Sequence, residues 1–242
     1  MGAWDLYRAR AAVKGTTRRE SSLNKVQGFI SRKLPDSLSF KQVIIGGSEQ
    51  ALAVIDTDKA NVKTICCLPG ETFPAGAVIE WADNIWLVTE LDAHSEVYMR
   101  GAMQQCNFLV KWFNTEGELI CRHCIIEDGT KYLTGVFEER VMGVGDARVA
   151  MTIGKDSETV KIYRGRRFII DDPDSGQPLA YEVTKPNKLF GLYVGEGVHK
   201  HILTEVNTSD DDNLTLMIAD YFKYRPDERP NVPPSGVPGG WL

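Results

Sequence analysis

The chain has 242 residues, 43% of them hydrophobic and 25% charged, and its formal net charge at pH 7 is −5. This length and composition allow at least one full hydrophobic core, arranged in one or two domains. No stretch approaches the roughly 18 to 20 uninterrupted apolar residues of a membrane span, and the opening MGAWDLYRAR lacks the apolar run of a secretory signal. We therefore expect synthesis in the cytoplasm and no membrane partner.

The charge is unevenly distributed along the chain. Residues 1 to 33 contain eight lysines or arginines against only Asp5 and Glu20, so this segment carries +6 and the remainder carries −11. A basic segment on an acidic body steers association with nucleic acid or with an acidic neighbouring subunit. Both partners remain open on this observation.

Residues 1 to 38 form the basic N-terminal segment and contain the one clear helix. Thr17 to Glu20 fits a capping box, and Pro35 ends the helical pattern. An apolar stripe runs along one face, which must dock on the chain's own β body, as is usual for surface helices, or on a neighbouring subunit. The stripe consists of Leu23, Val26, Ile30 and Leu34. Five cations lie on the other faces, and we expect them to contact another subunit: Arg18, Arg19, Lys25, Arg32 and Lys33.

From about residue 40 the apolar period changes to two, and turn residues recur at short intervals. The predicted fold is mainly β, with one or two antiparallel sandwich or barrel units, an N-terminal amphipathic helix and an extended C-terminal arm. The expected strands are 40–45, 50–56, 62–68, 77–81, 85–91, 105–113, 119–126, 148–153, 160–163, 167–170, 180–184, 189–194, 198–206 and 214–218. Strands 105–113 and 119–126 should form a hairpin around a loop that contains glycine.

The glycine-rich stretch from Glu127 to Gly145 predicts a joint between a first β unit at 39–145 and a second at 146–222. Loops of the second unit are acidic, and Asp171, Asp172 and Asp174 are the expected partners of the basic helix. From residue 223 the Pro and Gly density favours an extended arm to residue 242. Trp241 near its end is a further expected contact between subunits.

Candidate chemical sites are incomplete. Cys121 and Cys124 form a CxxC pair, yet no second ligand pair stands at a zinc spacing, so we interpret the five cysteines as reduced, buried thiols. His199 and His201 share one strand face, which we expect to be solvated. The DPDSG sequence at 172–176 lacks the glutamate of a calcium loop. No nucleotide-binding or hydrolase motif appears. We therefore expect a protein without enzymatic activity, metal or cofactor.

Aromatic side chains are frequent on the expected strands. They could stack bases of a single-stranded nucleic acid, but few lysines or arginines are interleaved with them, which favours a place in the core. The residues are Trp81, Trp86, Tyr98, Phe108, Trp112 and Phe113.

Five phrases occur in order over most of residues 76 to 222: GAVIEWADNIWLVTELD, MRGAMQQCNFLVKWFNTEGELI, DGTKYLTG, ETVKIYRGRRFIIDDPDSGQPLAYEVTKPNK and EVNTSDDDNLTLMIADYF. Together they resemble structural proteins encoded among the head-to-tail joining genes of tailed bacteriophages. The resemblance implies a virion protein of the neck: a connector, stopper or head-closure subunit that forms a homo-oligomeric ring between portal and tail. Its implied partners are copies of itself and the neighbouring portal and tail proteins, and contact with packaged DNA is open.

Two other readings are retained. One is a nucleic-acid-binding β protein that uses the basic helix and the aromatic strands. It differs from a ring subunit in salt dependence, because phosphate binding weakens steeply as salt is added. The other is an enzyme with an unrecognised site, for which the sequence offers no convergent carboxylates.

Overall fold

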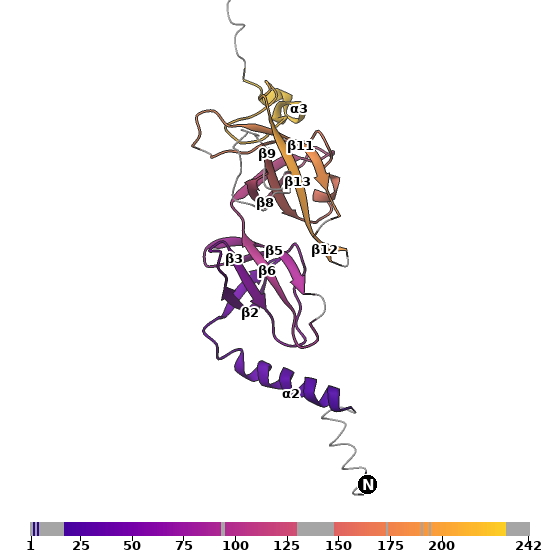
Figure 1. Ribbon diagram of the computed structural model, residues 1–242. Helices are drawn as coiled ribbons and strands as arrows, with labels where there is room; N and C mark the ends of the chain where they lie inside the picture. Colours follow the sequence, from indigo (N-terminus) through magenta and orange to yellow (C-terminus); the bar gives the residue numbers. More distant parts are fainter. Residues whose placement is uncertain are drawn as a thin grey trace, which may run out of the picture.

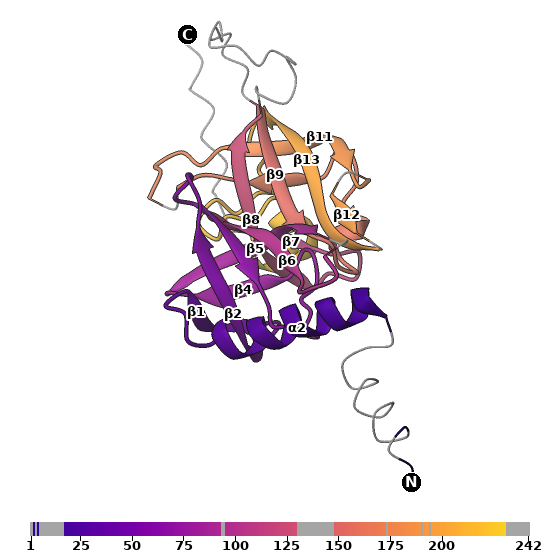
Figure 2. The same ribbon diagram turned by 60° about the horizontal axis from the view of Figure 1, so that its bottom comes forward.

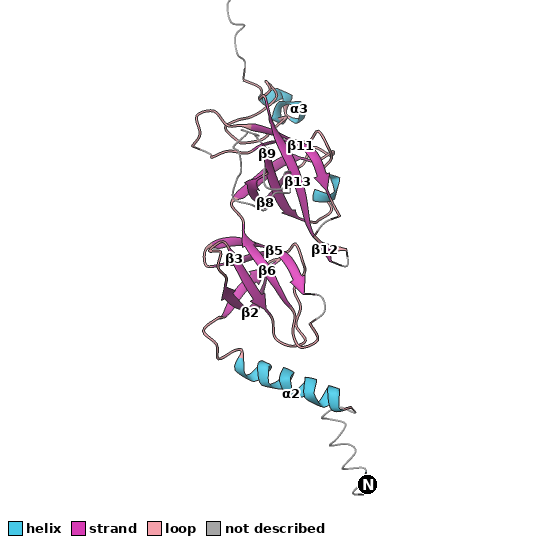
Figure 3. Ribbon diagram, in the orientation of Figure 1, coloured by secondary structure: helices cyan, strands magenta, loops and turns pink. Residues whose placement is uncertain are grey.

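The computed structural model describes residues 2, 4, 17–92, 95–129, 148–172, 174–189, 191–193 and 195–230. Two antiparallel β units follow one another along the molecule, and a helix lies at the far side of the first (Figures 1 and 3). This arrangement confirms the predicted fold class of a mainly β chain with barrel-like units and an N-terminal helix. Among the described residues no helix is both long and apolar enough to cross a membrane.

The first unit is a closed barrel with the strand order β1-β2-β3-β6-β5-β4. Its inward side chains pack into one core around Leu52, Ile65, Phe73, Ile79 and Met103. The strands are β1 (Phe40–Ile45), β2 (Ser48–Asp56), β3 (Val62–Cys66), β4 (Val78–Trp81), β5 (Asn84–Asp92) and β6 (Arg100–Gln105).

The strand β6 was not expected from the sequence. Its segment RGAMQQ contains no β-branched or aromatic residue, so its local preference for a strand is weak. It forms because β3 and β5 pair with it on both sides. Tertiary pairing therefore overrides local propensity at this position.

The barrel closes through a short pairing between its first and fourth strands. Only Ile44 with Glu80 and Ile45 with Ile79 are paired between β1 and β4, whereas β1 pairs with β2 over its whole length. The hairpin turn at Ala82 and Asp83 ends β4, and both turn residues have positive φ angles. From Val43 toward the start of β1, no residue pairs with β4, so the edges of the two strands diverge there.

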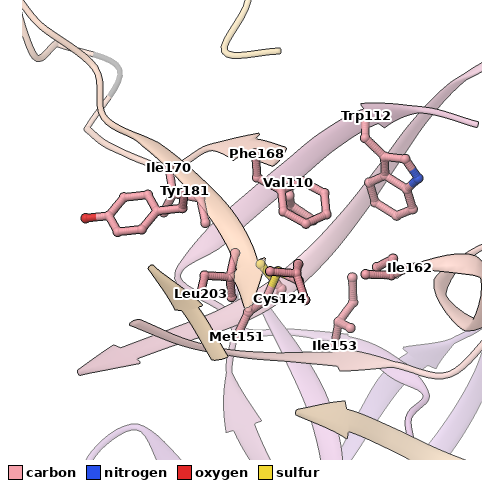
Figure 4. Close-up of a cluster of buried hydrophobic side chains, with 11 residues drawn as sticks. Val110, Trp112, Cys124, Met151, Ile153, Ile162, Phe168, Ile170, Tyr181 and Leu203 are labelled. Carbon is pink, nitrogen blue, oxygen red and sulfur yellow. The ribbon is translucent and has the colours of Figure 1, made fainter. Parts of the chain in front are cut away.

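The second unit has the strand order β10-β11-β13-β9-β8-β7, with β12 paired to β13. The end strands β10 and β7 lie against each other, and Trp112 packs edge-on against Phe168 with ring centroids 5.9 Å apart. Figure 4 shows the buried side chains that fill this unit. The strands are β7 (Phe108–Phe113), β8 (Leu119–Asp128), β9 (Arg148–Gly154), β10 (Arg167–Ile169), β11 (Ala180–Asn187), β12 (Leu192–Tyr193) and β13 (Glu196–Val206).

The expected hairpin is confirmed, because β7 and β8 pair from Phe108 with Cys124 to Phe113 with Leu119. The expected unit boundary near residue 145 is wrong. Strand β8 pairs with β9, so the hairpin belongs to the second unit and the chain passes between units at Cys106 and Asn107. The glycine-rich stretch had suggested the joint, but its residues 130–147 lie between two paired strands and outside the described residues.

Two expected strands are absent from the described structure. Thr159–Lys161 is a 3-10 turn (η2), because the Asp156 carboxylate accepts hydrogen bonds from the backbone N–H groups of Glu158 and Thr159 and so favours a turn. Residues 214–218 form turns joined by one bridge, with Met217 at a positive φ of 58°. Both segments are apolar enough to resemble strands in sequence.

The C-terminal segment also differs from its expectation. Residues 223–230 were predicted to begin an extended arm, yet the helix α3 (Tyr221–Tyr224) and the 3-10 turn η3 (Pro226–Glu228) pack on the second unit. The Tyr224 ring stacks on Phe113 at 5.0 Å, which fixes the segment in place. The rest of the expected arm, residues 231–242 with Trp241, lies outside the described residues.

The two units touch through apolar side chains and through backbone. Leu87 of the first unit packs with Ile125 and Val198 of the second. A Cβ atom added to Gly76 would stand 1.9 Å from the carbonyl oxygen of Gly197, so only glycine allows this approach. The Gln104 side chain also donates a 2.7 Å hydrogen bond to Glu127.

Candidate assembly surfaces

The helix α2 (Arg18–Lys33) begins at the predicted capping box. The Thr17 hydroxyl accepts a hydrogen bond from the Glu20 N–H, and the Glu20 carboxylate accepts one from the Thr17 N–H. The helix lies across one side of the first barrel, beneath β1 and β2 in Figure 2. It buries no residue fully. Local capping therefore defines its start, while its packing on the barrel is incomplete.

One face of α2 turns toward its own barrel. Leu23, Ile30 and Leu34 are partly buried there, and the Gln27 side chain donates a 3.0 Å hydrogen bond to the Glu96 carbonyl oxygen. Three of the four stripe residues are thus partly buried, and Arg19 and Gln27 tie α2 to Glu96 of its own chain. Val26 stays 46% exposed.

The opposite face of α2 points outward and mixes cations with an aromatic ring. Residues spaced by three and four positions share one helix face, which places Phe29 between Lys25 and Arg32. Phe29 is 58% exposed, and both cations are exposed. We call the row of Arg18, Ser22, Lys25, Phe29 and Arg32 the outward face.

The five expected contact cations have different surroundings. Arg19 forms an ion pair with Glu96 at 2.6 Å, so this cation is bound within its own chain. Lys33 lies 4.0 Å from Asp36, and the Arg32 Nε donates to the Gly28 carbonyl oxygen of the same helix. Arg18 and Lys25 have no ion-pair partner within the described ranges. The outward face therefore keeps its charge available.

The expected acidic partners of the helix lie in the loop between β10 and β11. Asp171 accepts hydrogen bonds from the backbone N–H groups of Asp172 and Leu179, and Asp172 accepts one from Asp174. The loop belongs to the second unit, whereas α2 lies beside the first (Figure 1). The structure does not bring these residues together within one chain.

A second acidic surface, on the first barrel, was missed by the sequence reading. An open groove of about 650 Å³ follows the diverging edges of β1 and β4, and its lining includes Ile44, Trp81 and Ile85. Three exposed carboxylates, Glu49, Glu80 and Asp83, also line it. These residues are scattered over 35 positions of sequence, and only the β1–β4 closure gathers them.

Cross-strand pairing aligns part of this groove into one row. Glu49 and Glu80 are each paired directly opposite Ile44, on its two sides, and Ile85 is opposite Glu80. Directly paired residues project from the same face of a sheet. Glu49, Ile44, Glu80 and Ile85 therefore form an alternating acidic and apolar row, which we call the acidic row.

The histidine prediction was wrong. His199 and His201 share one face of β13, as expected, but that face is the interior of the second unit, and the two side chains are 1% and 0% exposed. Within the described chain, both ring nitrogens of His201 and the Nδ1 of His199 have no hydrogen-bond partner. Burial, together with His199 and Lys188, lowers the pKa of His201 to about 4.

The cysteine pair cannot act as a unit, because Cys121 is exposed and Cys124 is buried on the opposite face of β8. Burial raises the pKa of the Cys106 thiol to about 12, and it raises that of Cys124 as well. The described residues contain no cluster of three or more potential metal ligands. The expectation of buried thiols holds for Cys66, Cys67 and Cys124.

The aromatic side chains fill the two cores for the most part. Trp86, Trp112 and Phe113 are buried, and Phe113 also carries Tyr224 and the Arg225 guanidinium on its ring. Trp81, Tyr98 and Phe108 are partly buried. A stacking platform for bases would need these rings on the surface, so this arrangement favours the core interpretation.

A partly buried ionic network attaches residues 212–220, which precede α3, to the second unit. Arg167 donates to both carboxylate oxygens of Asp212, at 3.0 and 2.7 Å, and to Asp220 at 3.1 Å. Asp212 also accepts the backbone N–H groups of Ser209 and Asp220. Burial alone would lower the pKa of Arg167, but the two carboxylates outweigh this effect, so its pKa is raised above the ordinary value.

Comparison with known proteins assigns no family. No family model matches the chain, and no curated protein matches it. One solved structure, described as "MrkH, A novel c-di-GMP dependence transcription regulatory factor", aligns with 76% of this chain and 83% of its own, at 9% identity and a TM-score of 0.23. A likeness at that TM-score carries no argument about fold or function.

Proposed function

We propose that this chain is a structural virion protein of a tailed-bacteriophage neck, where copies form a ring between portal and tail that closes the head and helps to retain packaged DNA. The ordered phrases over residues 76 to 222 support the phage assignment by their resemblance to head-to-tail joining proteins. The proposal gives the chain no enzymatic activity and no cofactor. It names as partners other copies of the chain and the adjoining portal and tail proteins.

The observation that carries the assembly role is the outward face of α2. Phe29 is 58% exposed between Lys25 and Arg32, on a helix that its own barrel leaves without a fully buried residue. Aromatic side chains and arginines are enriched at the centres of protein–protein interfaces. Both β units have their own complete cores, so α2 is an addition to a finished scaffold.

The arrangement of the two ends supports the same role. The helix α2 lies at the side of the first unit, while α3 lies on the second unit (Figure 1). Contacts made by different surfaces of identical subunits are heterologous, and they close into rings when the rotation between subunits allows it. A chain with distinct surfaces at its two ends is suited to such contacts.

Of the two features that suggested a nucleic-acid-binding protein, the aromatic strands and the basic helix, only the helix still supports that reading. Its aromatic component is weakened because Trp86, Trp112 and Phe113 belong to the cores. The basic helix still has charge available for phosphates. Salt dependence separates the two functions, because each phosphate neutralised contributes about −0.7 to −0.9 to the slope of log affinity against log salt concentration.

The test is negative-stain microscopy and mass measurement of the purified full chain, combined with inactivation of its gene in the phage that encodes it. We expect rings with a central channel. Lysates without the protein should contain free tails, and heads that lose packaged DNA and fail to join those tails. Normal infectious particles without the protein would contradict the neck role. A monomer that binds single-stranded DNA with a steep salt dependence would support the nucleic-acid reading instead.

A further inference from the structure

The acidic row and the outward face of α2 have matching chemistry. The row presents carboxylates at Glu49 and Glu80 with the Ile44 side chain between them, and Ile44 is 37% exposed. The outward face presents cations at Lys25 and Arg32 with Phe29 between them. Each surface thus has an apolar centre and two flanking charges, and the charges are of opposite sign.

The spacings of the two patterns also agree. Lys25 and Arg32 are seven residues apart, which is about 10 Å along a helix at about 1.5 Å per residue. Glu49 and Glu80 lie on β2 and β4, with β1 between them. Neighbouring strands are about 4.8 Å apart, so these two side chains are also about 10 Å apart. A helix laid across the three strands can therefore place Phe29 on Ile44 and both cations at carboxylates.

The partner charges are available on both surfaces. Within the described part of the chain, Glu49, Glu80 and Asp83 form no ion pair, and neither does Lys25. The carboxylates of Asp171 and Asp172, in contrast, already accept backbone hydrogen bonds of their own loop. The groove beside the acidic row adds apolar surface from Trp81 and Ile85, which suits Phe29 and Val26.

The contact must join two copies. In its own chain α2 is held by Glu96, through Arg19 and Gln27, with its outward face turned away from that barrel. We propose that the outward face of α2 docks on the acidic row of a second copy, so that each subunit gives a helix to one neighbour and accepts a helix from the other. This inference rests on the proposed function, because it supplies the subunit contact of the ring.

The experiment exchanges charges between the two surfaces in the full chain. It measures the mass of the oligomer and the dissociation constant between subunits for each variant. The groove variant is Glu49→Lys with Glu80→Lys, and the helix variant is Lys25→Glu with Arg32→Glu. Each should weaken association by about ten- to a hundredfold, because two attractive pairs become repulsive. The combined variant carries all four substitutions and should recover most of the affinity, since opposite charges then face each other again.

A control matched to the groove variant carries Asp58→Lys and Glu116→Lys, which make the same change in net charge at exposed positions away from the groove. It should associate like the wild type. Rings that form normally in the groove variant, or a combined variant that is no better than either parent, would overturn the inference and leave the proposed function standing. A wild-type chain that stays monomeric would overturn both.

Discussion

At the scale of single residues, the buried histidine pair of β13 is the clearest departure from ordinary packing. His201 is completely buried, and among the described residues neither of its ring nitrogens has a hydrogen-bond partner; the His199 ring lies 5.9 Å from it. Desolvation of the charged form is the largest cause of the low pKa of His201, and the positive charge of Lys188 adds to it. For His199 as well, burial and the nearby Lys188 and Lys155 lower the pKa, against a smaller opposing effect of Asp156.

Because of this buried pair, we expect the protein to lose stability in mild acid. The folded state favours neutral His201, with a pKa of about 4 against 6.5 ordinarily, so the unfolded chain binds the extra proton between these values. The free energy of unfolding should therefore fall as pH drops below about 6.5 and level off below about 4, by about 3 kcal/mol in total. Urea unfolding of the wild type and His201→Leu at pH 7 and pH 5 measures this.

His201→Leu should lose less stability between the two pH values than the wild type does. His123→Gln serves as the control, because His123 lies on β8 and is only partly buried; this variant should follow the wild type. Equal pH dependence in all three proteins would show that the buried pair is not the cause.

At the scale of elements, the turns at residues 212–220 depend on one partly buried arginine, Arg167. Removing one partner of a buried ion pair costs about 3 to 5 kcal/mol, because the remaining charge stays desolvated. Arg167→Met should accordingly lower the free energy of unfolding by about 3 kcal/mol, since it leaves the Asp212 carboxylate at 0% side-chain exposure without its cation. Arg122→Met breaks the more exposed pair with Asp156 and should cost less than about 1 kcal/mol. Denaturant titration of both variants gives the comparison, and equal losses would refute it.

Helices and strands could be predicted from the sequence where their local residue pattern agrees with the pairing or packing that they have in the fold. Alternation gives most strands to within a few residues, and the capping box gives the start of α2. The strand β6 has no such local pattern, and η2 is a turn because of one aspartate side chain. The acidic row is not visible in sequence, because strand register alone makes neighbours of Glu49 and Glu80.

The two histidines show what the sequence pattern of a strand cannot predict, namely which of its two faces points to the core. Alternation correctly places His199 and His201 on one side of β13 with Leu203. Which side faces the core depends on how the sheet curls, and the polar character of imidazole suggested solvent. The unit boundary failed for a related reason, because the pairing of β8 with β9 is a long-range contact.

At the scale of the whole molecule, the contact between the two units predicts a strict requirement for glycine. Gly76→Ala would put a Cβ 1.9 Å from the Gly197 carbonyl oxygen. Gly70 is the matched control, because its φ of +92° resembles the +79° of Gly76 while open space surrounds it. We expect Gly70→Ala to cost about 1 kcal/mol from backbone strain alone and Gly76→Ala clearly more. Thermal unfolding of both variants tests this, and equal shifts would mean that the units do not depend on the contact.

The close approach of Gly76, Gly154 and Gly197 also bears on mechanical stiffness. At Gly154, as at Gly76, an added Cβ would collide with backbone of the other unit, in this case the carbonyl oxygen of Gly76, 2.4 Å away. Backbone that rests on backbone cannot yield by changing rotamers, and densely packed interiors have low compressibility. A push directed from one unit toward the other would therefore be transmitted through this contact between glycines. A chain built this way would resist compression along the line that joins its two units, and the proposed place beneath packaged DNA would require that property.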